Sequence, residues 1–175
     1  GRCVVGEAPS PREDPGEAEG GRGVKSSENR TVADINAGDS ASVGRALGQE
    51  DIEPFAVMSG DVNPAHEDAV DARGDMFHKI IAHGMWGGTL ISALLGTKLP
   101  GPGAIYLSQE LRFRGPVGIG DTITVEVAAR EKDAGRHRVV FDCTCTNQQG
   151  AEEILGTPVV IAPAGKVQRP AHLLP

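Results

Sequence analysis

The second half of the chain alternates hydrophobic and polar residues, which is the pattern of β-strands that bury one face. The alternation is clear in residues 104–114, 121–131 and 137–146, and weaker in 153–162. Segments rich in Asp, Asn and Gly lie at 132–136 and 147–150, and both have the length of hairpin turns. The pattern therefore predicts a meander of antiparallel strands.

One face of each predicted strand collects the apolar side chains. The residues expected to share a face are Ile105, Leu107, Leu111 and Phe113, then Ile123, Val125 and Val127, then Val139, Phe141, Cys143 and Cys145. The inner face of the fourth strand is ambiguous. The three cysteines, Cys3 included, form no disulfide framework, and the two strand cysteines are expected to be small buried hydrophobes. This cysteine usage fits a reducing cytoplasm.

One long helix is predicted before the strands. Residues 85–95 are apolar nearly all the way round, which is typical of a buried helix, and Gly96 with the Pro-Gly run at 100–103 ends it. A shorter helix is expected over 48–60, and short strands over 31–35 and 41–47. Together these helices and strands predict an α+β fold, with the sheet wrapped around the long helix. Apolar surface and strand edges remain uncovered, so a homodimer or higher oligomer is the natural completion.

The ends of the chain have a different composition from its middle. Residues 1–28 are rich in Gly, Pro, Glu and Ser and are expected to be a disordered tail, while 166–175 read as a linker or tail around a folded domain at 29–165. The net charge is -7 and the pI about 5.2, with basic residues scattered, which argues against nucleic acid as a partner. No apolar run approaches the roughly 20 residues of a membrane span.

The stretch SGDVNPAHEDA, residues 59–69, holds the first candidate chemistry. The proline disfavours a helical Asn63, which makes Asn63 a natural N-cap and His66 a first-turn residue. Asp61 then lies in the preceding loop, where Gly60 permits the turn, and can converge with His66 on one water. The positive end of the helix favours a neutral imidazole beside a carboxylate, as a general acid/base pair needs. A capped surface turn is the simpler alternative.

A second candidate group is IAHGMWGG, residues 81–88, at the start of the long helix. His83 and Gly84 fall at the helix start, and the Gly84 amide has no intrahelical acceptor. Such an amide can hold the oxygen of a polarised carbonyl. Alternatively, glycine is there only for close packing. Together the two stretches offer groups for proton transfer to and from water and a backbone N–H that could stabilise an oxyanion.

These residues resemble a known family. The run from Phe55 to His66, with Ala72 after it, is similar to the signature of the MaoC-like, (R)-specific enoyl-CoA hydratases, and the resemblance continues through AHGM and LRFRGPVGIGDTITVEV to about residue 165. It implies a hot-dog fold assembled as a dimer. It also implies reversible hydration of a trans-2-enoyl-CoA to the (R)-3-hydroxyacyl-CoA without a metal or redox cofactor, coenzyme A being part of the substrate.

The resemblance also implies roles for single residues. Asp61 and His66 would be the catalytic pair that activates water, in an order that the sequence leaves open, and the Gly84 amide would hold the thioester oxygen. The supporting motif positions are Ser59, Gly60, Asn63 and His83. Arg112 and Arg114, on a polar strand face, are candidate partners for the phosphates of coenzyme A, and Lys79 is a weaker one. A bulky Trp86 beside the site hints at short acyl chains.

Other readings compete with hydration. His66, His78 and His83 with Asp61 could form a metal site, but their spacings match no familiar zinc arrangement and ligation would consume the base. A hot-dog thioesterase would aim the water at the carbonyl carbon instead. A non-catalytic acyl-CoA-binding or dimerisation module is the third alternative. The chain further resembles the N-terminal part of bifunctional enoyl-CoA hydratase/phosphate acetyltransferase proteins, whose phosphate acyltransferase domain is absent from these 175 residues.

Overall fold

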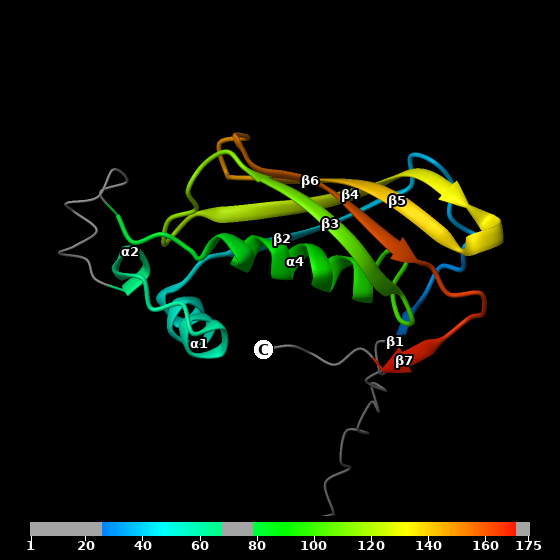
Figure 1. Cartoon of the computed structure of the whole chain (residues 1–175), viewed down its shortest axis with the longest axis horizontal. Helices are drawn as coiled ribbons and strands as arrows, with labels where there is room; N and C mark the ends of the chain where they lie inside the picture. The colour runs from blue at the N-terminus through cyan, green and yellow to red at the C-terminus, as the bar shows by residue number, and fades with distance from the viewer. Residues whose placement is uncertain (1–25, 68–78, 171–175) are drawn as a thin grey trace, which may run out of the picture.

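Five antiparallel strands form the main sheet, in the order β2-β4-β5-β6-β3 (Figure 1). The computed structural model describes residues 26–67 and 79–170 of the chain. The strands are β2 (Ser40–Ala46), β3 (Ile105–Phe113), β4 (Thr122–Asp133), β5 (Arg138–Thr146) and β6 (Glu152–Ile161). The four predicted later strands and the strand expected over 41–47 are therefore confirmed. The turn between β4 and β5 contains the short 3-10 helix η1 (Ala134–Arg136).

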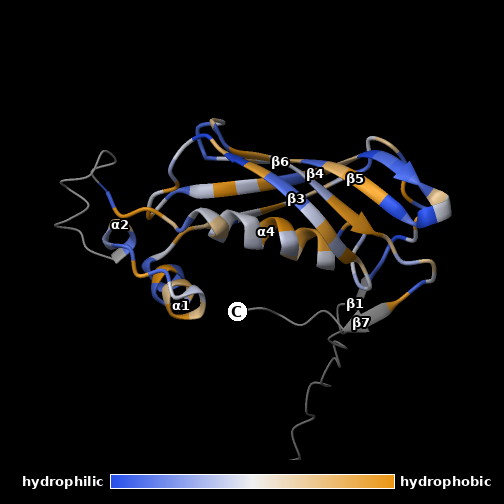
Figure 2. Ribbon diagram, in the orientation of Figure 1, coloured by the Kyte–Doolittle hydropathy of each residue, from blue (hydrophilic) through white to orange (hydrophobic). Residues whose placement is uncertain are grey.

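The long helix α4 (Gly84–Thr97) runs along one face of this sheet (Figure 1). Figure 2 shows hydrophobic residues alternating with polar ones along the strands and covering much of α4. Ile91, Leu94 and Leu95 of the helix pack into the same buried cluster as residues of β4 and β5. Burying this apolar surface is the main favourable contribution to folding. The predicted hot-dog arrangement, a curved antiparallel sheet around one helix, is confirmed.

The alternation in the strands corresponds to their burial. Ile123, Val125 and Val127 of β4 are completely buried, and the predicted inward residues of β5, both cysteines included, are buried as well. In β6, where the sequence was ambiguous, Ile154 and Val160 face the core. A register shift in the β5–β6 pairing, next to Cys145, interrupts the regular alternation.

Two helices lie beyond the N-terminal end of α4 (Figure 1). They are α1 (Gln49–Ser59), which confirms the helix expected over 48–60, and the single turn α2 (Pro64–Glu67). The strand expected over 31–35 is wrong, because this segment forms a turn. The Asp34 carboxylate accepts hydrogen bonds from both the backbone N–H and the hydroxyl of Thr31, and this local pairing replaces a strand ladder.

The sequence overestimated how much of α4 and β3 one protomer buries. Met85 of α4 is 56% exposed, so the helix is buried on one side only. On β3, Ile105 is 58% and Phe113 is 52% exposed, and Leu107 is exposed too. These residues are exposed because β3 is an edge strand, which among the described strands pairs with β6 alone.

The predicted tails are shorter than expected where the structure describes them. Strand β1 (Ser26–Glu28) pairs antiparallel with β7 (Gln168–Pro170) in a second small sheet, so 26–28 belong to the fold and the linker expected at 166–175 begins as a strand. The reason is backbone pairing between two segments that have few apolar residues of their own. Residues 1–25 and 171–175 of the predicted tails lie outside the described residues. No helix in the described ranges combines the length and the apolar character needed to cross a membrane.

Candidate active site

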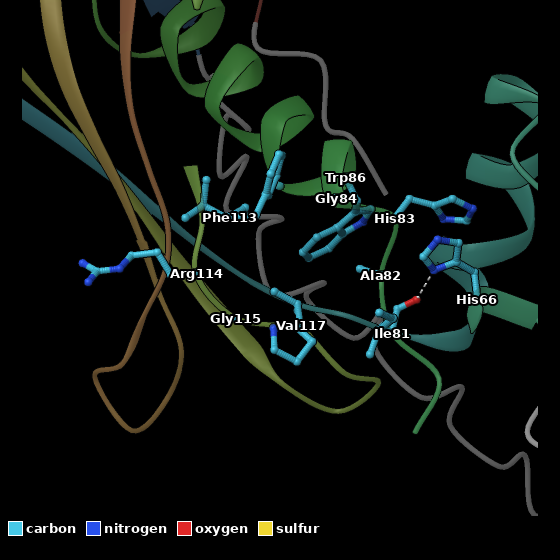
Figure 3. A pocket seen from close by; sticks show the side chains of 13 residues that line it. His66, Ile81, Ala82, His83, Gly84, Trp86, Phe113, Arg114, Gly115 and Val117 are labelled. Atoms are coloured by element: carbon cyan, nitrogen blue, oxygen red, sulfur yellow. Dashed lines mark hydrogen bonds between the residues drawn. The ribbon is translucent and has the colours of Figure 1, made fainter. Parts of the chain in front are cut away.

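A cavity of about 310 Å³ lies beside the first turn of α4. Its size is at the lower end of small-molecule pockets. Figure 3 shows His66 and His83 on one side of it, Trp86 in its wall and Arg114 on the opposite side, with the Arg114 guanidinium directed away. The lining residues are His66, Ile81, Ala82, His83, Gly84, Trp86, Gly87, Phe113, Arg114, Gly115, Pro116, Val117 and Ile154. Most of these side chains are apolar, and the polar groups converge at the histidine side.

The loop that carries Asp61 is held by its own short-range hydrogen bonds. Gly60 ends α1 in the left-handed conformation, with φ of 75°, which a glycine adopts without strain. The Ser59 hydroxyl donates to the Phe55 carbonyl at 2.7 Å and accepts from the Asp61 amide at 3.2 Å. The Asp61 carboxylate in turn accepts from the Asn63 amide at 3.3 Å. The motif thus fixes the backbone on both sides of an exposed carboxylate.

Asn63 and His66 occupy the helix positions that the sequence predicted. The Asn63 side chain accepts from the Ala65 amide at 3.2 Å, which is an N-cap hydrogen bond. His66 is buried, and its Nδ1 lies 2.8 Å from the Ile81 carbonyl oxygen. Because a carbonyl only accepts, Nδ1 carries the proton and the lone pair of a neutral ring lies on Nε2. The expected helix dipole has little part in this, since α2 is one turn long.

His83 and Gly84 begin α4 as expected, at the N-cap and first helical position. The Gly84 amide has no acceptor in the described ranges, which agrees with the predicted unpaired N–H. A β-carbon at Gly84 would lie 3.3 Å from the Phe113 ring, so glycine lets this ring approach the helix start. The His83 ring is buried and lies against His66, with 4.0 Å between ring centroids.

The predicted pair does converge in space. Asp61, His66 and His83 each offer an atom within 4.8 Å of those of the other two. A water that makes hydrogen bonds of ordinary length to two acceptors spans roughly 4.5 Å between them. The separation of the Asp61 carboxylate and the His66 ring is therefore compatible with one bridging water. Asp61 itself is not among the residues that line the cavity, whereas His66 is.

Asp61, His66 and His83 are also three of the four residues of the possible metal site. His78, the fourth residue of that site, lies outside the described residues. The hydrogen bond from His66 Nδ1 to Ile81 leaves only Nε2 as a ligand atom, and ligation there would occupy the lone pair that water activation needs.

The candidate coenzyme A partners separate in the structure. Arg114 lines the cavity and pairs with Glu152 at 3.0 Å. Arg112 pairs with Glu110 at 2.9 Å and lines a different depression, on the sheet. Both side chains are more than half exposed. Of the two, Arg114 has the position that a ligand of this cavity could reach.

Lys79 pairs with Asp121 at 3.2 Å and helps to hold the turn that precedes β4. Burial alone would raise the pKa of Asp121, but hydrogen bonds from Gln148, the Gly118 amide and Lys79 outweigh this effect, so the pKa is lowered. The Asp121 carboxylate is thereby kept ionised and fixes the loop that follows Val117 of the cavity wall. Lys79 has a structural partner and is the weaker candidate for binding phosphate.

Comparison with known proteins places this geometry in a family. The family described as MaoC like domain matches residues 17–149. The chain belongs to that family. It is 45% identical over 131 residues to an (R)-specific enoyl-CoA hydratase of Rhodospirillum rubrum, which covers 75% of this chain and 90% of the relative. It is 42% identical over 113 residues to a 3-hydroxybutyryl-CoA dehydratase of Methylorubrum extorquens, covering 65% and 72%.

A solved structure agrees with these relatives. The unliganded R-hydratase of Pseudomonas aeruginosa matches this MaoC-like domain with a TM-score of 0.82 and 39% identity, over 86% of this chain and 97% of that one. The likeness therefore covers the sheet, the central helix and the segment that carries the site.

Parts of the site could not be read from the sequence. The acceptor for His66 is the backbone carbonyl of Ile81, which any residue type supplies, so no sequence signal marks it. Val117 and Ile154 of the cavity wall come from distant segments and read only as ordinary core residues. The contact between His66 and His83 also depends on the fold, since it brings together residues from α2 and the start of α4.

Proposed function

We propose that this MaoC-like domain is an (R)-specific enoyl-CoA hydratase that acts reversibly on short trans-2-enoyl-CoA substrates. The observation that carries the proposal is the convergence of Asp61 and His66 beside an apolar cavity, with the free Nε2 of His66 defined by the Ile81 hydrogen bond. The hydratase and dehydratase names of the relatives support the same reaction read in its two directions.

The proton balance of the reaction follows from the protonation state of the pair. Hydration breaks an O–H bond of water, joins the oxygen to C3 of the enoyl chain and adds a proton to C2. When His66 is neutral beside a carboxylate, the pair holds no spare proton, so the proton that reaches C2 is the one that the pair has taken from water. The enzyme then ends the cycle unchanged. Either Asp61 or His66 can be the group that first accepts it.

The start of α4 supplies the second element of the mechanism. As water attacks C3, negative charge develops on the thioester oxygen. An unpaired backbone N–H in an apolar setting stabilises such charge without having to reorganise. The Gly84 amide is the group in that position, and Gly84 lines the cavity. Arg114, on the opposite side, is our candidate for contact with a coenzyme A phosphate.

The reaction is tested directly with crotonyl-CoA. Hydration removes the enoyl absorbance, and chiral analysis identifies the product. We expect (R)-3-hydroxybutyryl-CoA. Release of free thiol would instead identify a thioesterase. Coenzyme A binding without turnover of crotonyl-CoA or of longer enoyl-CoA esters would indicate a binding module and refute the proposal.

Site variants then test the pair. Asp61→Asn and His66→Ala should each lower kcat by roughly 100- to 10,000-fold, which is the usual contribution of a general acid or base. The exposed Val62, next to Asp61, offers a control, and Val62→Ala should keep kcat within about twofold because its side chain is 65% exposed and offers no group for proton transfer. Wild-type kcat in either site variant would remove that residue from the mechanism.

We further propose that two copies associate through the exposed edge of β3. Ile105, Leu107 and Phe113 expose apolar surface there, and the backbone edge of β3 is unpaired among the described strands. Phe113 also lines the cavity, so a second copy on this edge would border the site.

Analytical ultracentrifugation tests this assembly. We expect a dimer for the wild type and a shift to monomer for Leu107→Lys, which places a charge on the edge. Val57→Lys, a change at an exposed residue of α1, which is not part of the sheet, serves as the control. A monomeric wild type, or a Leu107→Lys variant that remains as dimeric as the wild type, would contradict this assignment.

A further inference from the structure

His83 makes contacts with both members of the proposed acid/base pair. Its Nε2 lies 2.9 Å from the backbone carbonyl oxygen of Asp61, and its ring centroid lies 4.0 Å from that of His66. Its ring also lies against Phe55 of α1, with centroids 4.9 Å apart. A single side chain from the start of α4 thus contacts α1, the Asp61 loop and α2. Figure 3 shows the two imidazoles side by side at the edge of the cavity.

The hydrogen bond of His83 determines where its proton lies. A carbonyl oxygen can only accept, so Nε2 must donate to it. The other nitrogen, Nδ1, is buried and has no partner in the described ranges. The proton of a neutral His83 ring therefore lies on Nε2, and Nδ1 carries the lone pair.

The segment before α4 fixes both halves of the pair in this way. The Ile81 carbonyl accepts from His66, and two residues later the His83 ring donates to Asp61. The segment itself is anchored, because the Ala82 amide donates to the Val117 carbonyl at 2.8 Å. Short-range bonds within the Asp61 loop set its shape. Within residues 26–67 and 79–170, the bond to His83 is the hydrogen bond that joins this loop to residues 81–83, whose Ile81 carbonyl holds His66.

From this arrangement we infer that His83 is the positioning residue that holds Asp61 and His66 at their working separation. Its Nε2–H fixes the backbone of the Asp61 loop, and its ring supports one face of His66. Displacing a catalytic group by about 1 Å can lower the rate roughly 100-fold. Loss of the His83 bond should therefore reduce kcat while leaving substrate binding nearly intact. This inference rests on the proposed hydratase activity only for its kinetic test.

Two variants separate the two contacts. His83→Phe keeps a ring against His66 and loses the donor, whereas His83→Gln keeps a side-chain N–H donor and loses the ring. With crotonyl-CoA we expect kcat to fall roughly 10- to 100-fold in the Phe variant, with KM changed less than about threefold. The Gln variant should recover much of that loss. Ile91→Val, at a fully buried position of the same helix, is the control for a purely structural effect and should keep wild-type kcat.

The kinetic result can overturn the inference in two ways. A Phe variant with wild-type kcat would show that the donor is not needed. Equal losses in the Phe and Gln variants, matched to their losses in melting temperature, would show that His83 only stabilises the fold. If the wild type hydrates crotonyl-CoA and one of these patterns appears, the positioning role fails while the proposed function stands.

A measurement that needs no turnover tests the same arrangement. Imidazole 15N NMR of the folded wild type near neutral pH should show His83 protonated at Nε2 and His66 protonated at Nδ1. In His83→Phe, the His66 signals should shift because the neighbouring ring loses its anchor on the Asp61 loop. A His83 proton on Nδ1, or rapid exchange between its tautomers, would overturn the inference. If these tautomers hold in a protein that does not hydrate enoyl-CoA, the proposed function fails and the arrangement remains.

Discussion

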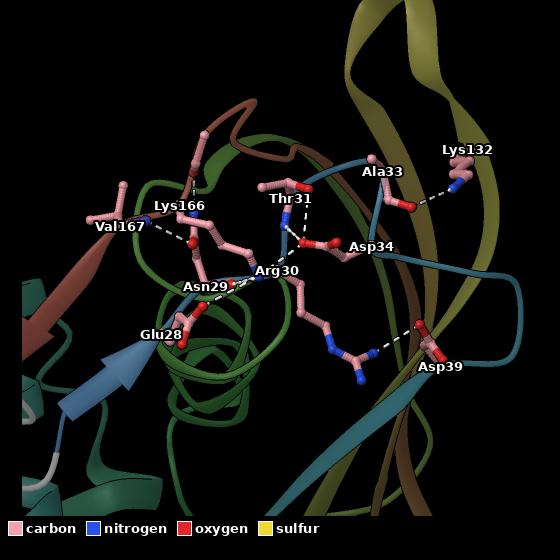
Figure 4. Close-up of polar contacts among 11 residues, drawn as sticks. Glu28, Asn29, Arg30, Thr31, Ala33, Asp34, Asp39, Lys132, Lys166 and Val167 are labelled. Atoms are coloured by element: carbon pink, nitrogen blue, oxygen red, sulfur yellow. Dashed lines mark hydrogen bonds and ion pairs between the residues drawn. The ribbon is translucent and has the colours of Figure 1, made fainter.

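Asn29 ties the two ends of the described chain together, and replacing it should weaken the whole fold. Its side chain is 1% exposed, donates to the Gly165 carbonyl at 2.9 Å and accepts from the Val167 amide at 2.9 Å. Figure 4 shows Asn29, in the segment after β1, beside Val167 of the segment before β7. The Val32 amide also donates to the Pro163 carbonyl and Lys166 to the Asn29 carbonyl, so the Asn29 side chain supplies one part of the attachment between these segments.

The cost of Asn29→Ala can be estimated bond by bond. Each hydrogen bond contributes about 1 to 1.5 kcal/mol, and a buried partner left without its bond adds to the loss. Gly165 is exposed, so water can replace its bond, whereas Val167 is half-buried and its amide is less easily hydrated. We expect a loss of about 2 to 3 kcal/mol in the free energy of unfolding. For a domain of this size that lowers the melting temperature by roughly 6 to 10 °C.

Urea unfolding followed by the fluorescence of the single, buried Trp86 measures this change. The midpoint should fall and the slope should stay constant. Asn29→Asp is the matched variant: it keeps the acceptor for the Val167 amide but sets a buried carboxylate oxygen against the Gly165 carbonyl, so its loss should be at least as large. A change below about 0.5 kcal/mol in Asn29→Ala would refute the reasoning, because the terminal segments would then be held by other contacts.

Three further predictions concern titration and specificity. The Lys166 and Thr31 hydrogen bonds lower the pKa of Asp34 from 3.8 to about 2, so the stabilisation by the carboxylate is complete above pH 3.8 and is lost as the pH falls toward 2. The difference in melting temperature between the wild type and Asp34→Asn should therefore shrink over that range, and a constant difference would contradict it. Burial raises the pKa of Cys143 to about 11 and that of Cys145 to about 12, so at pH 8 both thiols should react with an aromatic disulfide reagent only after unfolding. Trp86→Leu should enlarge the cavity and raise kcat/KM for longer enoyl-CoA substrates relative to crotonyl-CoA, and an unchanged chain-length profile would show that Trp86 does not limit the acyl chain.

The sequence predicted the elements whose pattern is local. Alternation identified β4 and β5 with the correct inward face, because Ile123 and Phe141 must be buried for the sheet to have a core. The proline at position 64 similarly predicted the N-cap at Asn63, which depends on backbone geometry alone. The strand expected over 31–35 failed because a side-chain bond from Asp34, rather than a pattern, decides that segment.

Features that depend on distant segments were outside the reach of sequence reasoning. The pairing of β1 with β7 joins residues about 140 positions apart through backbone groups that every residue carries. The exposed apolar residues of β3 alternate like buried ones, and only the strand order reveals that they lie at an edge. At the site, the sequence grouped His83 with Asp61 and His66, but the stacking of the His83 ring on His66 and its bond to the Asp61 carbonyl depend on the fold.

The Asn29 hydrogen bonds and the candidate active site lie at opposite ends of α4, so changes at the two places should affect stability and catalysis separately. Arg30, next to Asn29, donates its amide to the Pro100 carbonyl just after the helix ends, while His83 caps its start. A helix of 14 residues is about 21 Å long, and perturbations so far apart usually add. The double variant Asn29→Ala/His83→Phe should therefore show the sum of the two losses in unfolding free energy. Below its unfolding transition it should have the kcat of His83→Phe alone. A further loss of kcat in the double variant would mean that the terminal segments help to hold α4 in register with the cavity, and that stability and catalysis are coupled along the helix.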